Sequence, residues 1–317
     1  KKCNFADEKQ KATISVTLCF RHTGTNMGVD ILDIQHWVED QMIRGRYMFT
    51  KQDVLDLGLP IKDVSVKRSL QRLEAKGTIM SPWQNFYVAV ATEYKLKGVV
   101  PPSFYIDKLM AFLGRDYYVS HLTAAALNGA SHQMAMVFQA MVSGGPIRSG
   151  VKNGTKLEFT LRQKLPLEFT HKVKTQSGYM TVADAELTAL DVVAENNKVG
   201  GLSRAAELLV ELCEQTKWDA SKLPLLSYFS VATIQRLGFI LDLIEEHEQA
   251  DSLYILMKQT GKTVRRVPLK QTAPVTDGMP VDERWKVISS RTDKAYHVSP
   301  WRGIGMVAEP YDSTKEA

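Results

Sequence analysis

Residues 65–91 read SVKRSLQRLEAKGTIMSPWQNFYVAVA, and this stretch decides the fold of the N-terminal part of the chain. Val66, Leu70 and Leu73 recur at the spacing of one helical face, so they predict a helix with one buried side. Ser65 has the hydroxyl of an N-cap residue and is predicted to begin this helix.

A hairpin is predicted directly after this helix. Gly77 can adopt the left-handed backbone conformation that ends a helix, and two β-like runs, 78–81 and 86–91, follow it. The four residues 82–85 between the runs contain Pro and Asn and predict the turn.

Two more helices are predicted upstream. The residues 30–44 carry apolar side chains at intervals of three and four, and Thr50 is placed to cap a short helix that buries Val54, Leu55 and Leu57. Helix, helix, basic helix and hairpin is the order of a winged helix-turn-helix, which we assign to residues 27–95.

The exposed face of the third helix is basic, which favours DNA binding. Arg68 and Arg72 lie one turn apart and suit guanine edges, Gln71 suits adenine, and Lys67 suits phosphate. Winged helices also dock proteins, in which case such a face is only solvated. The predicted DNA-binding residues are Lys62, Ser65, Lys67, Arg68, Gln71, Arg72, Lys76, Trp83, Gln84 and Asn85.

The remainder is predicted to form a second domain of the mixed α/β class, so the whole chain is of the α+β class. Residues 96–103 are predicted to be a linker because Pro101 and Pro102 follow two valines. The second domain is assigned to residues 104–305, and Thr181 with Asp184 resembles a capping box within it. The segments 1–26 and 306–317 are predicted to be tails.

Composition excludes several classes of protein. The chain has 317 residues, of which 44% are hydrophobic and 24% charged, as in globular proteins. No stretch approaches the roughly 18 consecutive apolar residues of a membrane helix. Cys3, Cys19 and Cys213 are too few and too far apart for a disulfide framework, which favours a reducing, cytoplasmic location.

Catalytic and cofactor signatures are weak. The run 303–308, GIGMVA, matches a dinucleotide pattern but has no room for the helix that such a site needs. His121 and His132 lack partners at metal-ligand spacing and are predicted to be packing or cap residues. Glu74 with Lys76 has no second carboxylate for a magnesium nuclease. We therefore predict no catalytic residue, metal or cofactor.

Five segments together resemble a known family. They are KRSLQRLEAKGTIMSPWQNFYVAV at 67–90, YYVSHLTAAALNGASHQ at 117–133, TVADAELTALDVV at 181–193, GGLSRAAELLVEL at 200–212 and VATIQRLGFILD at 231–242. In this order they resemble the AbiEi-type antitoxins of the abortive-infection AbiE system, a type IV toxin–antitoxin pair.

The resemblance implies a bipartite antitoxin. Its winged helix would repress its own operon by binding inverted repeats in double-stranded DNA. Its C-terminal domain would counteract a nucleotidyltransferase-like toxin without forming a stable complex. The resemblance suggests a basic antitoxin surface that comprises Arg148, Lys152, Lys156, Arg162, Lys164, Arg265 and Arg266.

Two other functions stay open from the sequence. One is a winged-helix regulator whose second domain senses a small molecule, and the other is a nuclease fused to a DNA reader.

Overall fold

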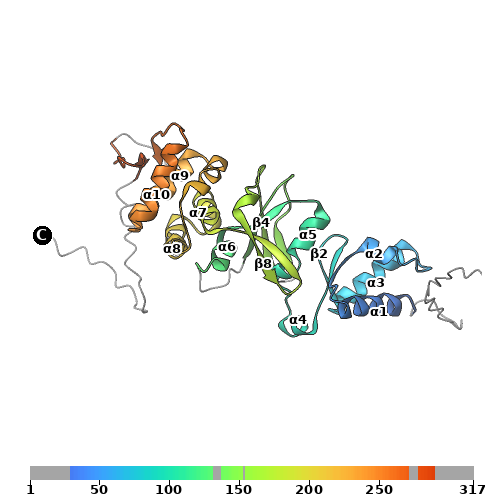
Figure 1. Ribbon diagram of the computed structural model, residues 1–317. Helices are drawn as coiled ribbons and strands as arrows, with labels where there is room; N and C mark the ends of the chain where they lie inside the picture. Colours follow the sequence, from blue (N-terminus) through green and yellow to red (C-terminus); the bar gives the residue numbers. More distant parts are fainter. Residues whose placement is uncertain (1–28, 131–136, 153, 271–277, 290–317) are drawn as a thin grey trace, which may run out of the picture.

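The computed structural model describes residues 29–130, 137–152, 154–270 and 278–289, so both predicted tails and His132 lie outside the described residues. Within these ranges the chain is mixed α/β, as predicted. Three parts follow one another along the molecule: an N-terminal part, a central sheet and a C-terminal group of helices (Figure 1).

The N-terminal part combines helices with a small antiparallel sheet. Its strands lie in the order β1-β3-β2, so β1 and β2 are the edges. Its elements are α1 (Val29–Ile43), β1 (Met48–Thr50), α2 (Lys51–Leu55), α3 (Asp63–Ala75), β2 (Ile79–Trp83), β3 (Phe86–Ala89) and α4 (Thr92–Lys97).

Local sequence signals explain most of these boundaries. Thr50 caps α2 through a reciprocal capping box with Asp53, as predicted for the cap. Gly77 follows α3 with φ of +69°, the conformation expected of a stop. Two expectations were wrong. The helix α3 begins at Asp63, so Ser65 lies inside its first turn, and Leu57 is 37% exposed rather than buried.

The central part is a six-stranded mixed sheet in the order β6-β7-β5-β4-β9-β8. The neighbouring pairs β4–β9 and β5–β7 are parallel, and the other three neighbouring pairs are antiparallel. The strands are β4 (Tyr117–Val119), β5 (Val137–Val142), β6 (Gly150–Lys152), β7 (Thr155–Leu161), β8 (Thr170–Thr175) and β9 (Gly178–Ala183).

Helices cover both faces of this sheet. In Figure 1, α5 lies between the sheet and the N-terminal part, whereas α6 and α7 lie on the opposite side with the remaining helices beyond them. Thr181 is a residue of β9, and Asp184 alone caps α7 by accepting a hydrogen bond from the Leu187 amide at 2.9 Å. The helices are α5 (Ile106–Leu113), α6 (His121–Leu127), α7 (Ala185–Ala194), α8 (Leu202–Leu212), α9 (Val231–Leu243) and α10 (His247–Gln259).

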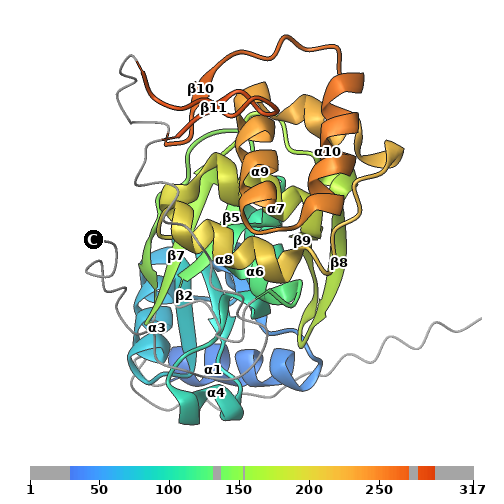
Figure 2. The same cartoon turned by 90° about the vertical axis from the view of Figure 1, so that its left-hand side faces the viewer.

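The segment that carries β10 and β11 packs against one end of α9 (Figure 2). The short strands β10 (Val267–Pro268) and β11 (Val287–Ile288) pair in parallel. Trp285, which precedes β11 in the sequence, is fully buried, and its indole nitrogen donates a hydrogen bond to Asp242 at 2.6 Å.

The small N-terminal sheet contributes to two hydrophobic cores. One of its faces packs with α1 and α3 through Tyr87 and Ala89, and the other joins the large core through Phe86 and Val88. Val100, in the predicted linker 96–103, is 3% exposed and belongs to the same large core. The second half of the predicted linker is therefore packed against the core, since Pro102 is buried too, whereas Leu96 is 89% exposed. The other domain boundaries stay predictions.

Candidate functional site

The helix α3 presents a basic face opposite its buried side. Val66, Leu70 and Leu73 are at most 1% exposed and hold the helix on the smaller core. Except for the buried Ser69, the helical period turns the residues between them to the solvent. Those exposed side chains are Lys67, Arg68, Gln71 and Arg72, with Lys62 and Lys76 at the two ends of the helix.

These cations are not neutralised within the described part of the chain. No carboxylate there lies within 4.0 Å of a basic group of Lys67, Arg68 or Arg72, whereas Lys51 nearby forms an ion pair with Asp63 at 2.6 Å. Exposed and unpaired guanidinium groups keep their donors free for an external anion. The face is therefore equipped to contact phosphate or base edges.

The turn between β2 and β3 carries the other predicted DNA contacts. Gln84 and Asn85 are exposed, and Asn85 has φ of +63°, a left-handed conformation that Asn tolerates. Trp83 is half-buried against the large core. The Ser81 hydroxyl donates to the Trp83 carbonyl at 2.8 Å and braces the hairpin from inside. The tip is thus held rigidly and offers two amide side chains.

Not every residue of the predicted antitoxin surface is exposed. Lys152 lies in β6, next to the exposed Lys156 of β7. The other exposed members are Arg148, Lys164, Arg265 and Arg266. Arg162 differs from them, because its side chain is 17% exposed and turns inward.

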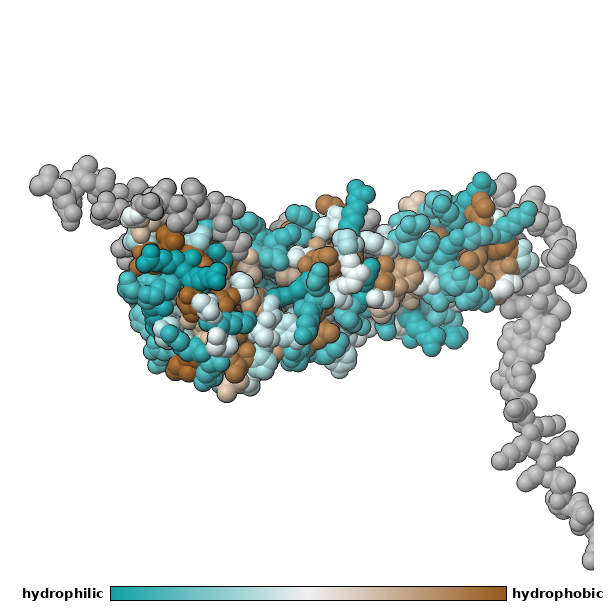
Figure 3. All heavy atoms as spheres, turned by 90° about the horizontal axis from the view of Figure 1, so that it is seen from above, coloured by the Kyte–Doolittle hydropathy of each residue, from teal (hydrophilic) through white to brown (hydrophobic). Residues whose placement is uncertain are grey.

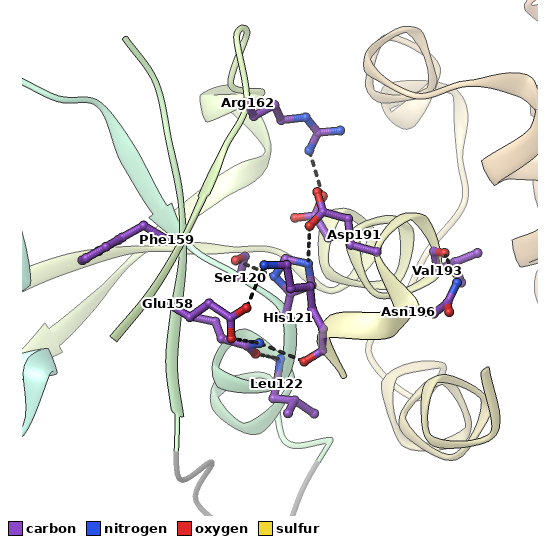
Figure 4. A network of polar contacts seen from close by, with 12 residues as sticks. Ser120, His121, Leu122, Glu158, Phe159, Arg162, Asp191, Val193 and Asn196 are labelled. Carbon is purple, nitrogen blue, oxygen red and sulfur yellow. Dashed lines mark hydrogen bonds and ion pairs between the residues drawn. The ribbon is translucent and has the colours of Figure 1, made fainter. Parts of the chain in front are cut away.

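Arg162 belongs to a buried polar network between the sheet and α7 (Figure 4). Its guanidinium donates to Asp191 and to the Tyr118 hydroxyl, both at 2.8 Å, and stacks over the Phe229 ring at 4.2 Å. The Tyr118 hydroxyl donates in turn to Asp191 at 2.9 Å. Burial raises the pKa of Asp191 to about 7, while the charge of Arg162 acts in the opposite direction.

His121 lies beside this network, at the carboxyl end of β4. It is 1% exposed and has φ of +50°, which is rare for a residue other than glycine. Its Nδ1 is 2.9 Å from the Ser120 hydroxyl, and its Nε2 has no hydrogen-bond partner. The nearest carboxylate oxygen in an ion-pair contact, on Glu195, is 3.8 Å from Nε2. Burial, assisted by the charge of Lys198, lowers the pKa of His121 to about 4, so the imidazole is neutral near pH 7.

The network joins elements that are distant in sequence. Lys198 forms an ion pair with Glu158 of β7 at 2.7 Å, and the side-chain amide of Gln139 in β5 donates to the Lys198 carbonyl at 3.0 Å. These contacts fasten the loop after α7 to the sheet. Within the described ranges, no group of three His, Cys, Asp or Glu side chains is placed to hold a metal ion.

Sequence reasoning missed this network. The prediction that His121 is a packing residue agrees with its burial, but Tyr118 and Asp191 were not singled out. An aspartate flanked by Leu190 and Val192 in a helix that is buried from Ala185 to Val193 was the available signal.

The face of the molecule drawn in Figure 3 is largely hydrophilic. Figure 3 shows one face on which apolar residues form separate small patches between polar ones. Among the described helices, none is both long and apolar enough to cross a membrane.

Comparisons with known proteins give a family match for the stretch from β4 to α9. Residues 118–243 match the family model of the AbiEi antitoxin C-terminal domain, which confirms the resemblance over this part of the chain; the segment 67–90 lies outside the match. The crystal structure of the RV2827C protein from Mycobacterium tuberculosis has a similar fold, with a TM-score of 0.59 over 83% of this chain and 92% of that chain at 9% identity. No curated protein matches the chain. The similarity of fold therefore extends beyond the matched domain.

Proposed function

We propose that the protein is the antitoxin of a type IV abortive-infection system and the repressor of its own operon, since residues 118–243 match the AbiEi antitoxin C-terminal domain. The family match carries the antitoxin role. The basic face of α3 supports the repressor role.

We infer that the N-terminal part is a winged helix-turn-helix. Three features support this inference: the order of helices and strands, the antiparallel β2–β3 hairpin directly after α3, and the burial of one face of α3 against α1. In such proteins the helix in the position of α3 enters the major groove, and the hairpin approaches the neighbouring backbone.

The exposed groups on α3 suit the major groove of DNA. Arg68 and Arg72 can each bind the two acceptors of a guanine edge, and Gln71 can bind adenine through its amide. Lys67 and Lys76 can neutralise phosphates and release their counterions, so binding should weaken steeply with salt. Inverted repeats would bring two copies of the chain to one operator.

The C-terminal domain would counteract a nucleotidyltransferase-like toxin without a lasting complex. We assign this role to Lys152 of β6 and to the exposed cations of the proposed antitoxin surface, namely Arg148, Lys156, Lys164, Arg265 and Arg266. Arg162 supports this surface from inside, since its charge is already engaged by Asp191.

The test joins a genetic and a binding measurement. The reading frame adjacent to this gene is expressed under an inducible promoter with and without the full-length protein. We expect growth arrest and its rescue, together with a gel shift of the DNA upstream of the operon. Rescue without a gel shift would reject the repressor role alone. Absence of a toxic neighbour, with an operator released by a metabolite, would favour the small-molecule sensor. Metal-dependent cleavage of plasmid DNA would favour the nuclease.

A further inference from the structure

A groove of about 470 Å³ lies between the N-terminal part and the central sheet. One wall comes from α1, α2 and the loop before β1. The opposite wall includes Lys108 of α5 and Ser177, which lies in the turn between β8 and β9. This volume is within the range of about 300–1,000 Å³ that is usual for binding pockets.

The groove follows the outer edge of the strand β1. Met48 and Phe49 are neighbours in this strand and both line the groove. Their side chains nevertheless pack on opposite faces of the sheet, Met48 against the large core and Phe49 in the smaller one. A groove that meets both faces of a strand runs along its edge. The edge is free, because β3 is the only neighbour of β1 in the sheet of the described residues.

The backbone of Met48 is unpaired at this edge. The amide of Ala89 donates to the Tyr47 carbonyl at 2.7 Å, and the amide of Lys51 donates to the Asn85 carbonyl at 3.0 Å. Since antiparallel pairs alternate, residues 47, 49 and 51 bond to β3, and Met48 directs its N–H and C=O away from it. Neither group has a hydrogen-bond partner in the described part of the chain. Unpaired strand edges of this kind bind additional strands.

The groove is lined by two cations and two carboxylates, and among the described residues only the cations lack a polar side-chain contact. Arg46 and Lys108 are exposed, and neither has a carboxylate within 4.0 Å among the described residues. The two aspartates of the groove already accept hydrogen bonds. Asp53 takes two from Thr50, at 2.6 and 2.8 Å, and Asp56 takes one from an amide side chain at 2.7 Å. The charged hydrogen-bond donors of Arg46 and Lys108 are thus free to bind an acidic group of the occupant.

An aromatic wall completes the site. Trp37 is half-buried, lines the groove and meets Phe49 edge to face at a centroid distance of 5.3 Å. Its remaining ring surface offers apolar contact beside the unpaired backbone.

We propose that this groove binds an extended peptide segment of a partner protein as a fourth strand on β1. The peptide backbone pairs with Met48, an acidic side chain lies near Arg46 and Lys108, and an apolar side chain packs on Trp37. Main-chain bonds supply the general affinity in this mode of recognition, and the alternating side chains supply the specificity. The site is separate from the basic face of α3 and from the proposed antitoxin surface.

The test selects peptides on the full-length protein. A phage-displayed library of random heptapeptides is panned against the wild type and against Met48→Pro and Met48→Ala. On the backbone, proline removes an N–H that β3 does not use, and edge strands tolerate it there; Met48→Ala controls for the loss of the Met48 side chain from the large core. We expect enriched peptides with an acidic residue near an apolar one. Their synthetic forms should bind Met48→Pro roughly tenfold more weakly, which corresponds to one lost hydrogen bond. Met48→Ala should bind them almost as well as the wild type.

A second pair of measurements keeps the result decisive if Met48→Pro is poorly folded. In the ¹⁵N-labelled full chain, the selected peptide should shift the Met48 amide resonance, and Arg46→Ala with Lys108→Ala should weaken the acidic peptide but not its amide analogue. The proposal is overturned if no peptide is enriched, or if the selected peptides leave the Met48 amide unmoved. Equal binding by a folded Met48→Pro variant would also overturn it and would indicate a site for side chains or small molecules.

Discussion

Arg162 and Asp191 form an ion pair in which Nη1 and Oδ1 are 2.8 Å apart, between the end of β7 and the fully buried middle of α7. This pair places a member of the proposed antitoxin surface in a structural role. A buried carboxylate without its cation is strongly unfavourable, because the interior solvates the charge poorly.

The first prediction separates Arg162 from its exposed neighbours. Arg162→Ala should lower the free energy of unfolding by about 3–5 kcal/mol, since it leaves Asp191 buried without a partner. Lys156→Ala, at an exposed position of β7, should change it by less than about 0.5 kcal/mol. Urea denaturation followed by circular dichroism measures both. Equal stabilities for the two variants would contradict the buried pair.

The second prediction concerns operator binding. Arg68→Ala with Arg72→Ala should weaken binding at least roughly 30-fold, because each good base contact contributes about 1–3 kcal/mol. The matched control is Arg265→Ala with Arg266→Ala, which removes the same charge from two exposed arginines far along the chain. Gel-shift titration at fixed salt measures both, and toxin neutralisation should survive the first double change. Unaltered affinity in that variant would show that α3 does not read the operator.

The third prediction concerns acid stability. Folding lowers the pKa of His121 from 6.5 to about 4, so between these values the unfolded chain binds more protons than the folded one. Above pH 6.5 the imidazole is neutral in both states and does not reduce the free energy of unfolding. As the pH falls toward 4, the unfolded chain gains the proton first, and the free energy of unfolding decreases. The loss amounts to at most about 3.5 kcal/mol at about 1.4 kcal/mol for each pKa unit.

The variant His121→Asn isolates this effect, because Asn accepts the left-handed backbone and does not titrate. Thermal unfolding of both proteins between pH 4 and 7 should show a flatter pH dependence in the variant. Parallel curves would mean that other groups, such as Glu158, whose pKa is lowered in the folded chain, against the effect of burial, by its contact with Lys198, govern the loss of stability in acid.

The fourth prediction concerns the packing of the C-terminal segment. A Cβ at Gly238 would overlap the Trp285 ring, so Gly238→Ala should lower stability by about 1–3 kcal/mol or displace that ring. Gly150→Ala is the control, since nothing lies near its Cβ position and its φ is not positive. Tryptophan fluorescence during denaturation reports both stability and the environment of Trp285. A stable Gly238→Ala protein with unchanged fluorescence would contradict the close packing.

The fifth prediction concerns the junction between the two sheets. A fragment from Phe104 to Ala317 should fold and still rescue growth, as the sequence predicts, but at a lower melting temperature than the full chain. The reason is that Phe86, whose ring lies 5.5 Å from that of Phe112, contributes to the same core. A fragment that melts like the full chain would show that this contact adds nothing.

Local features of the chain followed from the sequence. The spacing of Val66, Leu70 and Leu73 predicted the buried side of α3 and thereby its basic face, and Thr50 and Gly77 marked helix boundaries. These signals act within one or two turns of backbone, so neighbouring residues suffice to state them.

Contacts between distant segments were decided only by the tertiary structure. Tyr118 and Asp191 are 73 positions apart, and no local spacing announces their hydrogen bond. The inward turn of Arg162 follows from the sheet order, which places the end of β7 beside α7. The groove at Met48 likewise depends on which edge of β1 stays unpaired. Periodicity shows that a side chain is buried or exposed, but only the pairing of strands and the packing of helices choose its partner.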